Sequence, residues 1–258
     1  MNKIFDIKAL VHKRNNVGLT KSNQNHFLLK YIYENIQQRF ETFGASFNDI
    51  MLVGAMSDEL VYFLQSKAKK KFLLCDSSKK LLAQYPDCES SLIKDEIIKS
   101  EYKFDFIYSF LDLHHINNLK EYLQSIRACL NKNGIFMACF FGEENLKDLR
   151  YIFLNENTVK SMPRFFPYID IKSAATILSK SGFAEPIADL DKISISYRNI
   201  SRLCNDIKDI AETNILSSRC DHLLDKNFLQ KIEKQLLKNK KEFEIEVQLI
   251  NVTCYLDN

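Results

Sequence analysis

The stretch Ile50–Leu60, IMLVGAMSDEL, runs from an apolar segment into a polar one with no loop between them. It predicts a buried strand over 50–53, a turn at Gly54 and then a helix. A strand joined this directly to a helix is the first unit expected of a nucleotide-binding α/β domain. The turn has one glycine, whereas such sites usually have two or three. The stretch therefore predicts the scaffold and leaves open whether the ligand still binds.

Apolar runs and helical patterns alternate downstream of this stretch. Strands are predicted over 50–53, 72–75, 91–93, 104–109 and 135–141, with helices near 58–67, 77–84 and 119–130. Strands separated by helices of about ten residues indicate parallel crossovers and a sheet covered on both faces. The segment 131–134 is predicted as a tight turn into the fifth strand. Ligands of such sheets bind outside the carboxyl ends of the strands.

The flanking regions have a different pattern. Apolar residues from Phe27 to Phe40 recur at helical spacing, with Gly44 as the stop. Helices are predicted near 143–155, 171–180, 200–212 and 229–237, an irregular link contains Pro163 and Pro167, and strands are predicted over 193–197 and 243–249. We expect these two strands to form an antiparallel edge. The chain is interpreted as a single domain over 1–258, with an N-terminal arm and helix (1–45), a cofactor-binding half (46–142) and a substrate or partner half (143–258).

Composition narrows the function classes. A formal charge of +3 over 258 residues does not indicate a nucleic-acid-binding surface. The lysine runs 67–71 and 238–241 are interpreted as solvated helix ends. Seven dispersed cysteines fit buried side chains in a reducing compartment, and no spacing predicts a metal site; Cys220 and His222 stand alone. No apolar run is long enough for a signal or a membrane span, so we expect a cytoplasmic protein.

Three segments carry a resemblance to a known family. They are IFDIKALVHKR (4–14), the stretch from FDFIYSFLDLHH to ENLKDLR (104–150), and FPYIDIKSAATILSKSGF continuing to AETNIL (166–216). They resemble bacterial relatives of the mitochondrial complex I assembly factor of methyltransferase-like fold and, more distantly, the malonyl-carrier-protein O-methyltransferase of biotin synthesis. The resemblance implies a Rossmann-like class I fold: a mostly parallel seven-stranded sheet with an antiparallel edge, helices on both faces and an N-terminal helical addition. It also implies S-adenosylmethionine as cofactor.

The family's glycine motif is degenerate here. Members place an acid and three glycines at the end of the first strand, where bare backbone approaches the amino-acid part of the cofactor. The matching positions are Leu52, Gly54, Met56 and Asp58, so Gly54 alone is kept, followed by Ala55. Met56 is expected either to fill the methionine pocket or to force a different loop. Both outcomes weaken cofactor binding.

Other positions match the family's cofactor contacts better. Asp76 ends the strand FLLCD, where an acid would accept hydrogen bonds from the ribose hydroxyls; capping of the next helix is the alternative. Asp95 matches the residue that receives the adenine amino group, although exposed loop acids are common. Ser109 and Phe110 open the segment expected to face the ligand. These residues, with Gly54 and Ala55, are the predicted cofactor contacts.

His114 and His115 are the adjacent histidines of the chain and follow the fourth strand. A histidine near neutral pH can act as a base or as a polar substrate contact, so both are catalytic candidates. A partly exposed loop role is the open alternative. Aromatic residues nearby, Tyr108, Phe140 and Phe141, are interpreted first as core.

Three functions remain open. One is an S-adenosylmethionine-dependent methyltransferase acting on a protein or carrier-linked substrate. Another is a non-catalytic assembly or chaperone-like factor whose partner is a respiratory-complex subunit. Family resemblance adds arginine hydroxylation, for which no iron-binding histidine and carboxylate pattern is evident in the sequence. The substrate and oligomeric state are not predicted.

Overall fold

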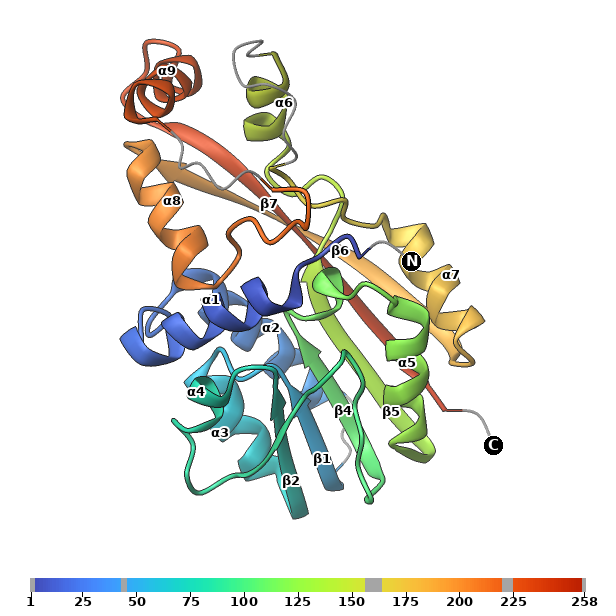
Figure 1. The fold of residues 1–258 in the computed structure, drawn as a ribbon. Coiled ribbons are helices and arrows are strands. Elements are labelled where there is room, and N and C mark those ends of the chain that lie inside the picture. Colours follow the sequence, from blue (N-terminus) through green and yellow to red (C-terminus); the bar gives the residue numbers. More distant parts are fainter. Residues whose placement is uncertain (1–2, 43–45, 156–163, 220–224, 257–258) are drawn as a thin grey trace.

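The computed structural model describes residues 3–42, 46–155, 164–219 and 225–256, and its centre is one seven-stranded sheet (Figure 1). The strand order is β3-β2-β1-β4-β5-β7-β6. The strands are β1 (Phe47–Val53), β2 (Ala68–Asp76), β3 (Glu89–Leu92), β4 (Phe104–Phe110), β5 (Leu130–Phe141), β6 (Ala184–Tyr197) and β7 (Phe243–Tyr255). β7 runs antiparallel to both of its neighbours, β5 and β6. The other four pairings, which join β3, β2, β1, β4 and β5, are parallel. The predicted mostly parallel sheet with an antiparallel edge is confirmed.

Helices cover both faces of this sheet. They are α1 (Ile7–Thr20), α2 (Phe27–Thr42), α3 (Asp58–Lys67), α4 (Lys79–Leu82), α5 (Leu119–Ala128), α6 (Lys147–Asn155), α7 (Ile171–Lys180), α8 (Ile200–Asp209) and α9 (Lys226–Leu237), with a 3₁₀ turn at Leu113–His115. None of these helices combines the length and apolarity that a bilayer crossing requires.

The alternation of β1 explains the two layers. Ile50 and Leu52 belong to the apolar cluster that includes α2 and α3, whereas Met51 and Val53 belong to the cluster that includes α5 and α7. Successive side chains of a strand point to opposite faces, so a continuous apolar run is what a sheet covered on both sides needs. All four side chains are fully buried.

The β6–β7 pair extends beyond the other strands and carries a third cluster. Tyr197, Phe243 and Ile245 pack there with side chains of α6, α8 and α9. Figure 1 shows these three helices gathered at the end of the long β6–β7 ribbon, away from β1 and β2. The late part of the chain thus builds its own apolar layer on the shared sheet.

Several boundaries differ from the sequence-based predictions. The first lysine run is a helix end only at Lys67, the last residue of α3, because Lys69–Lys71 lie in β2. At the second run α9 does end, with Lys238 as its cap. The segment 131–134 is part of β5, where the register with β4 shifts, rather than a separate turn. The late strands β6 and β7 are longer than predicted because they pair with each other along nearly their whole length.

The N-terminal arm is the largest difference. Residues 7–20 form helix α1, which begins at the cap residue Asp6, whose carboxylate accepts from the Ala9 N–H. Predicted features at Gly44, Pro163, Cys220 and His222 lie outside the described residues. The six described cysteines are free.

Candidate functional site

The site lies where the carboxyl ends of β1, β2 and β4 meet. Val53 pairs with Cys75 on one side and with Ser109 on the other, so the residues that follow each strand are neighbours. Gly54 has φ +105°, and a Cβ there would lie 2.4 Å from the Phe110 carbonyl oxygen. Glycine is therefore required at this position because β1 and β4 approach closely, whether or not a ligand binds.

Met56 closes the turn that the sequence analysis singled out. Its side chain is 1% exposed and packs in the apolar cluster of α2 and α3. The Asn23 side-chain amide donates to the Met56 carbonyl oxygen at 2.5 Å, which fixes the backbone of the turn. The turn is filled by the chain's own atoms, where the related motif would have bare backbone.

Asp76 makes a buried ion pair with Arg14. The guanidinium of Arg14 donates through Nε to Asp76 Oδ1 at 3.0 Å and through Nη2 to Oδ2. The side chains are 3% and 0% exposed. Burial acts to lower the pKa of Arg14, but the charge and hydrogen bonds of Asp76 outweigh it, so that pKa lies above its ordinary value.

Two backbone N–H groups take the remaining acceptor positions of the Asp76 carboxylate. The Ala55 N–H donates to Oδ2 at 2.8 Å and the Ser78 N–H donates to Oδ1 at 2.7 Å. Each oxygen thus accepts from one backbone amide and from Arg14. The helix cap is Ser78 and not Asp76, since the Ser78 hydroxyl accepts from the Leu81 N–H.

Helix α1 places Arg14 at the carboxyl ends of the strands. Leu10, Arg14, Val17 and Gly18 form its buried face. Gly18 lies against the backbone of Lys80 and Leu81, where a Cβ would come within 2.8 Å of both residues. Ser78 Oγ donates to Asn15 Oδ1 at 2.8 Å. Figure 1 shows α1 lying across the ends of the strands beside α4.

These contacts test the fit of an adenosyl cofactor. The resemblance gives Asp76 the role of accepting from two ribose hydroxyls, but both of its oxygens are already paired with buried donors. The Ala55 N–H is also used within the protein. The residues present do not fit the cofactor in this arrangement, because Arg14 would first have to leave Asp76 and α1 would have to move.

The other predicted contacts are divided between a small cavity and the core. Asp95 is exposed and lines a cavity of about 260 Å³ with Leu92 and Ile98, beside the ends of β2 and β3. Ser109 and Phe110 are fully buried, and the Ser109 hydroxyl has no hydrogen-bond partner among the described residues. Tyr108, Phe140 and Phe141 are buried as core residues, as predicted.

His114 and His115 converge on Glu212. Their Nε2 atoms lie 3.0 Å and 3.1 Å from Oε1 and Oε2 of Glu212, and their ring centroids are 3.9 Å apart. The side chains are 1%, 1% and 6% exposed. The histidines are therefore not partly exposed loop residues. Glu212 was missed in the sequence because it lies 97 residues beyond His115, in the loop after α8.

The charge states in this cluster follow from burial and pairing. Burial acts to raise the pKa of Glu212, but the two histidines outweigh it and hold that pKa below its ordinary value. Burial lowers the pKa of His115 to about 4, against the attraction of Glu212. Glu212 is thus an anion at neutral pH, and His115 is a neutral imidazole.

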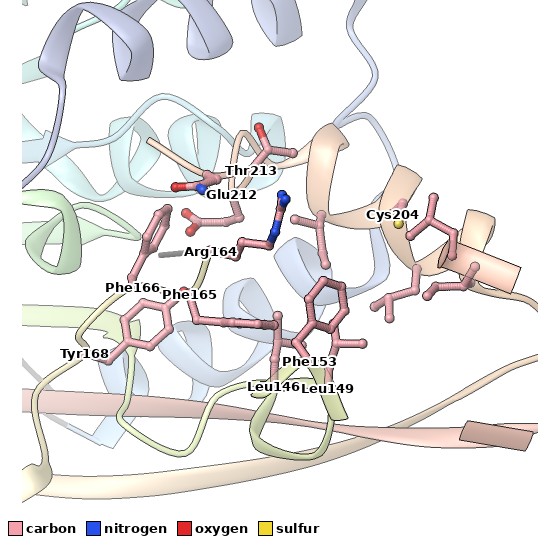
Figure 2. A pocket seen from close by; sticks show the side chains of 15 residues that line it. Leu146, Leu149, Phe153, Arg164, Phe165, Phe166, Tyr168, Cys204, Glu212 and Thr213 are labelled. Carbon is pink, nitrogen blue, oxygen red and sulfur yellow. The ribbon is translucent and has the colours of Figure 1, made fainter. Parts of the chain in front are cut away.

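An apolar pocket adjoins Glu212. It has a volume of about 220 Å³, and its walls come from α6, α8, α9 and the segment 164–168. Figure 2 shows Glu212 and Arg164 near one another, with Phe153, Leu146 and Leu149 on another side of the pocket. Arg164 Nε has no hydrogen-bond partner among the described residues. The pocket combines apolar walls with two charged groups.

Comparison with known proteins identifies the family. Residues 22–185 match the model of the methyltransferase domain. The chain belongs to the methyltransferase domain family. Its seven-stranded sheet is therefore the sheet of a methyltransferase domain, and in this domain Asp76 is paired with Arg14.

Individual relatives agree with this placement. The protein RP459 of Rickettsia prowazekii, which bears a methyltransferase name, is 30% identical over 209 residues, covering 79% of this chain and 90% of that protein. The mitochondrial arginine-hydroxylase NDUFAF5 of Dictyostelium discoideum is 25% identical, covering 88% of this chain and 58% of that protein. A malonyl-carrier-protein O-methyltransferase of Nitrosospira multiformis is 32% identical over 125 residues, covering 48% of this chain and 40% of that protein.

A solved structure shows the same fold. The S-adenosylmethionine-dependent methyltransferase of Thermotoga maritima superposes with a TM-score of 0.56 at 12% identity, covering 96% of this chain and all of that one. The fold is thus the one that holds S-adenosylmethionine in methyltransferases. The predicted family resemblance and fold are confirmed.

Proposed function

We propose that this chain is a methyltransferase-like factor that acts on a protein, and that its cofactor site is kept closed by α1, so that S-adenosylmethionine binds weakly or not at all. The observation that carries the proposal is the ion pair between Arg14 and Asp76. A buried carboxylate that accepts from a guanidinium and from two backbone amides has no acceptor position left for a ribose hydroxyl. Binding of a ribose would require one of these donors to be displaced, which costs free energy.

The relatives support a protein as the substrate or partner. The match to an arginine-hydroxylase spans 88% of this chain and 58% of that protein, and arginine is a side chain that a protein substrate can present. A respiratory-complex subunit is the partner that the family resemblance implies. We assign partner contacts to α6, because its Tyr151 and Leu154 side chains are apolar and exposed.

Calorimetry tests the closed site. We expect wild-type protein titrated with S-adenosylmethionine or S-adenosylhomocysteine to bind with a dissociation constant of about 1 mM or weaker. Arg14→Ala frees the Asp76 carboxylate, so the same titration should show binding at least about tenfold tighter, a gain of about 1.4 kcal/mol. Circular dichroism verifies that the variant is folded.

If the protein is instead a methyltransferase with an open cofactor site, the titrations should give the opposite result. Micromolar binding by the wild type that is abolished in Asp76→Ala would reject the closed site and favour cofactor-dependent methyl transfer. Arg39→Ala serves as the control, because it removes an arginine from a partly exposed ion pair with Asp189 that involves neither Asp76 nor any other predicted cofactor contact.

A pull-down with candidate respiratory-complex subunits tests the partner. Retention of a subunit by wild-type protein, without added S-adenosylmethionine, supports a factor that acts through protein contacts. We place the protein in the cytoplasm of a bacterium; this remains a prediction, consistent with the free cysteines among the described residues.

A further inference from the structure

The cluster of His114, His115 and Glu212 has the composition of a metal site. It brings two imidazoles and one carboxylate together, with one ligand atom from each within 4.8 Å of the others. Imidazole nitrogen and carboxylate oxygen are common ligands of zinc, iron, cobalt and nickel. We propose that His114, His115 and Glu212 form a binding site for one divalent transition-metal ion.

The distances between the ligand atoms suit a shared ion. The Nε2 atoms of His114 and His115 lie 3.0 Å and 3.1 Å from the Glu212 oxygens. Two ligands each about 2.0–2.1 Å from a zinc ion at a tetrahedral angle are separated by about 3.3 Å. A shift of a few tenths of an ångström in the side chains would therefore make room for an ion between these atoms.

The remaining nitrogens of both imidazoles leave the rings free to ligate. Nδ1 of His114 and Nδ1 of His115 are buried and have no hydrogen-bond partner among the described residues. Because an anionic Glu212 can only accept, each ring carries its proton on Nε2 in the structure as it stands. A metal ion at Nε2 would take the place of that proton, and the unpartnered Nδ1 is then the nitrogen that carries the ring proton.

The charged groups around the site have both signs: the buried Asp112 lies near it, and the cations Lys13 and Arg14 interact with Glu212. Asp112 lies near Arg14 and His114, and its carboxylate accepts a hydrogen bond from the Tyr122 hydroxyl. The guanidinium of Arg14 is already paired with Asp76, so it does not neutralise Glu212 through a direct contact. A divalent ion would offset the buried negative charge of Glu212, whose present partners are two hydrogen bonds from imidazoles.

Access to the site is through the adjoining pocket. Glu212 lines the apolar pocket of about 220 Å³ together with Arg164 and Phe166. Three protein ligands with an adjoining cavity leave at least one coordination position for water or another small ligand, which is the arrangement of catalytic rather than structural metal sites. The site is independent of the proposed function, because none of its ligands contacts the Arg14–Asp76 pair through a hydrogen bond.

Titration with Co²⁺ and Zn²⁺ tests the proposal without any cofactor or substrate. Protein freed of metal by a chelator should bind one Co²⁺ with visible absorption bands of a nitrogen and oxygen site, and Zn²⁺ should displace it. Glu212→Gln keeps the shape of the side chain but removes the charge, and should weaken binding by about 100-fold or more. His114→Ala should act in the same direction.

His12→Ala is the matched control, because His12 is an exposed histidine on α1 whose side chain contacts Asn16. It should bind Co²⁺ as the wild type does. Zn²⁺ should also raise the melting temperature of the wild type and of His12→Ala but not that of Glu212→Gln. Absence of stoichiometric binding by wild-type protein, or binding that Glu212→Gln leaves unchanged, would overturn the site.

Discussion

Replacing Arg14 by alanine should lower the free energy of unfolding by about 3–5 kcal/mol, because it leaves the Asp76 carboxylate buried without its cation. The Asp76 side chain is 0% exposed, so water cannot solvate the charge without a local opening of α1. The hydrogen bonds from the Ala55 and Ser78 amides remain, but they compensate only part of the charge. Urea unfolding followed by circular dichroism measures the loss.

The matched control is a second arginine and aspartate pair of similar geometry at the surface. Arg39 donates two hydrogen bonds to Asp189, with side chains 28% and 42% exposed. Arg39→Ala should cost about 1 kcal/mol or less, because solvent screens the pair and hydrates the carboxylate that remains. Equal losses for Arg14→Ala and Arg39→Ala would show that the inner pair has no special role in holding α1.

Gly54→Ala should also destabilise the fold strongly, by about 3 kcal/mol. The substitution places a Cβ on a residue with φ +105° and brings it 2.4 Å from the backbone oxygen of Phe110. The positive φ alone costs about 1–2 kcal/mol for an alanine, and relief of the overlap would require β1 and β4 to separate. Thermal and urea unfolding of the variant give the size of the effect.

Gly182→Ala separates the two causes. Gly182 also has positive φ, +89°, but the Cβ would meet the end of the Arg127 side chain at 2.9 Å rather than backbone. We expect a loss of about 1–2 kcal/mol, since Arg127 can move aside at the cost of its hydrogen bond to the Gly182 carbonyl. A Gly54→Ala variant no less stable than Gly182→Ala would contradict the close approach of β1 and β4.

The sheet could be predicted from the sequence because its strands are continuous apolar runs. Residues 50–53 and 104–109 needed no information beyond their own composition and the helices between them. The ends of strands were less predictable: Lys69–Lys71 extend β2 although their charges suggest a helix end, because an exposed strand end can hold lysines in water.

Helix α1 was missed for a specific reason. Its buried face contains Arg14 between Leu10 and Val17, so the apolar repeat is interrupted by a charged residue. The partner that makes burial of Arg14 tolerable is Asp76, 62 positions away. A local pattern therefore cannot reveal either the helix or the ion pair, although both ends of the pair lie in segments that the sequence analysis had marked.

The candidate site was half predicted. The adjacent His114 and His115 were evident as chemical groups, and the carboxyl end of β4 placed them near the ligand edge of the sheet. Glu212 follows α8, where the sequence pattern extended the helix and gave no reason to turn the side chain inward. Whether Glu212 lies beside the two histidines depends on the paths of β6 and α8 through the fold, and the composition of these segments does not specify those paths.

The position of β7 imposes an order on biosynthesis. Among the described strands, β6 is hydrogen-bonded to the sheet only through β7. Yet β7 is made only after α8, α9 and the rest of the 45 residues that separate it from β6. Until residues 243–255 leave the ribosome, β5 presents an unpaired edge and β6 has no neighbour to join. The nascent protein must therefore remain incomplete and open to edge-to-edge association for most of its synthesis, which makes it a candidate client for chaperones.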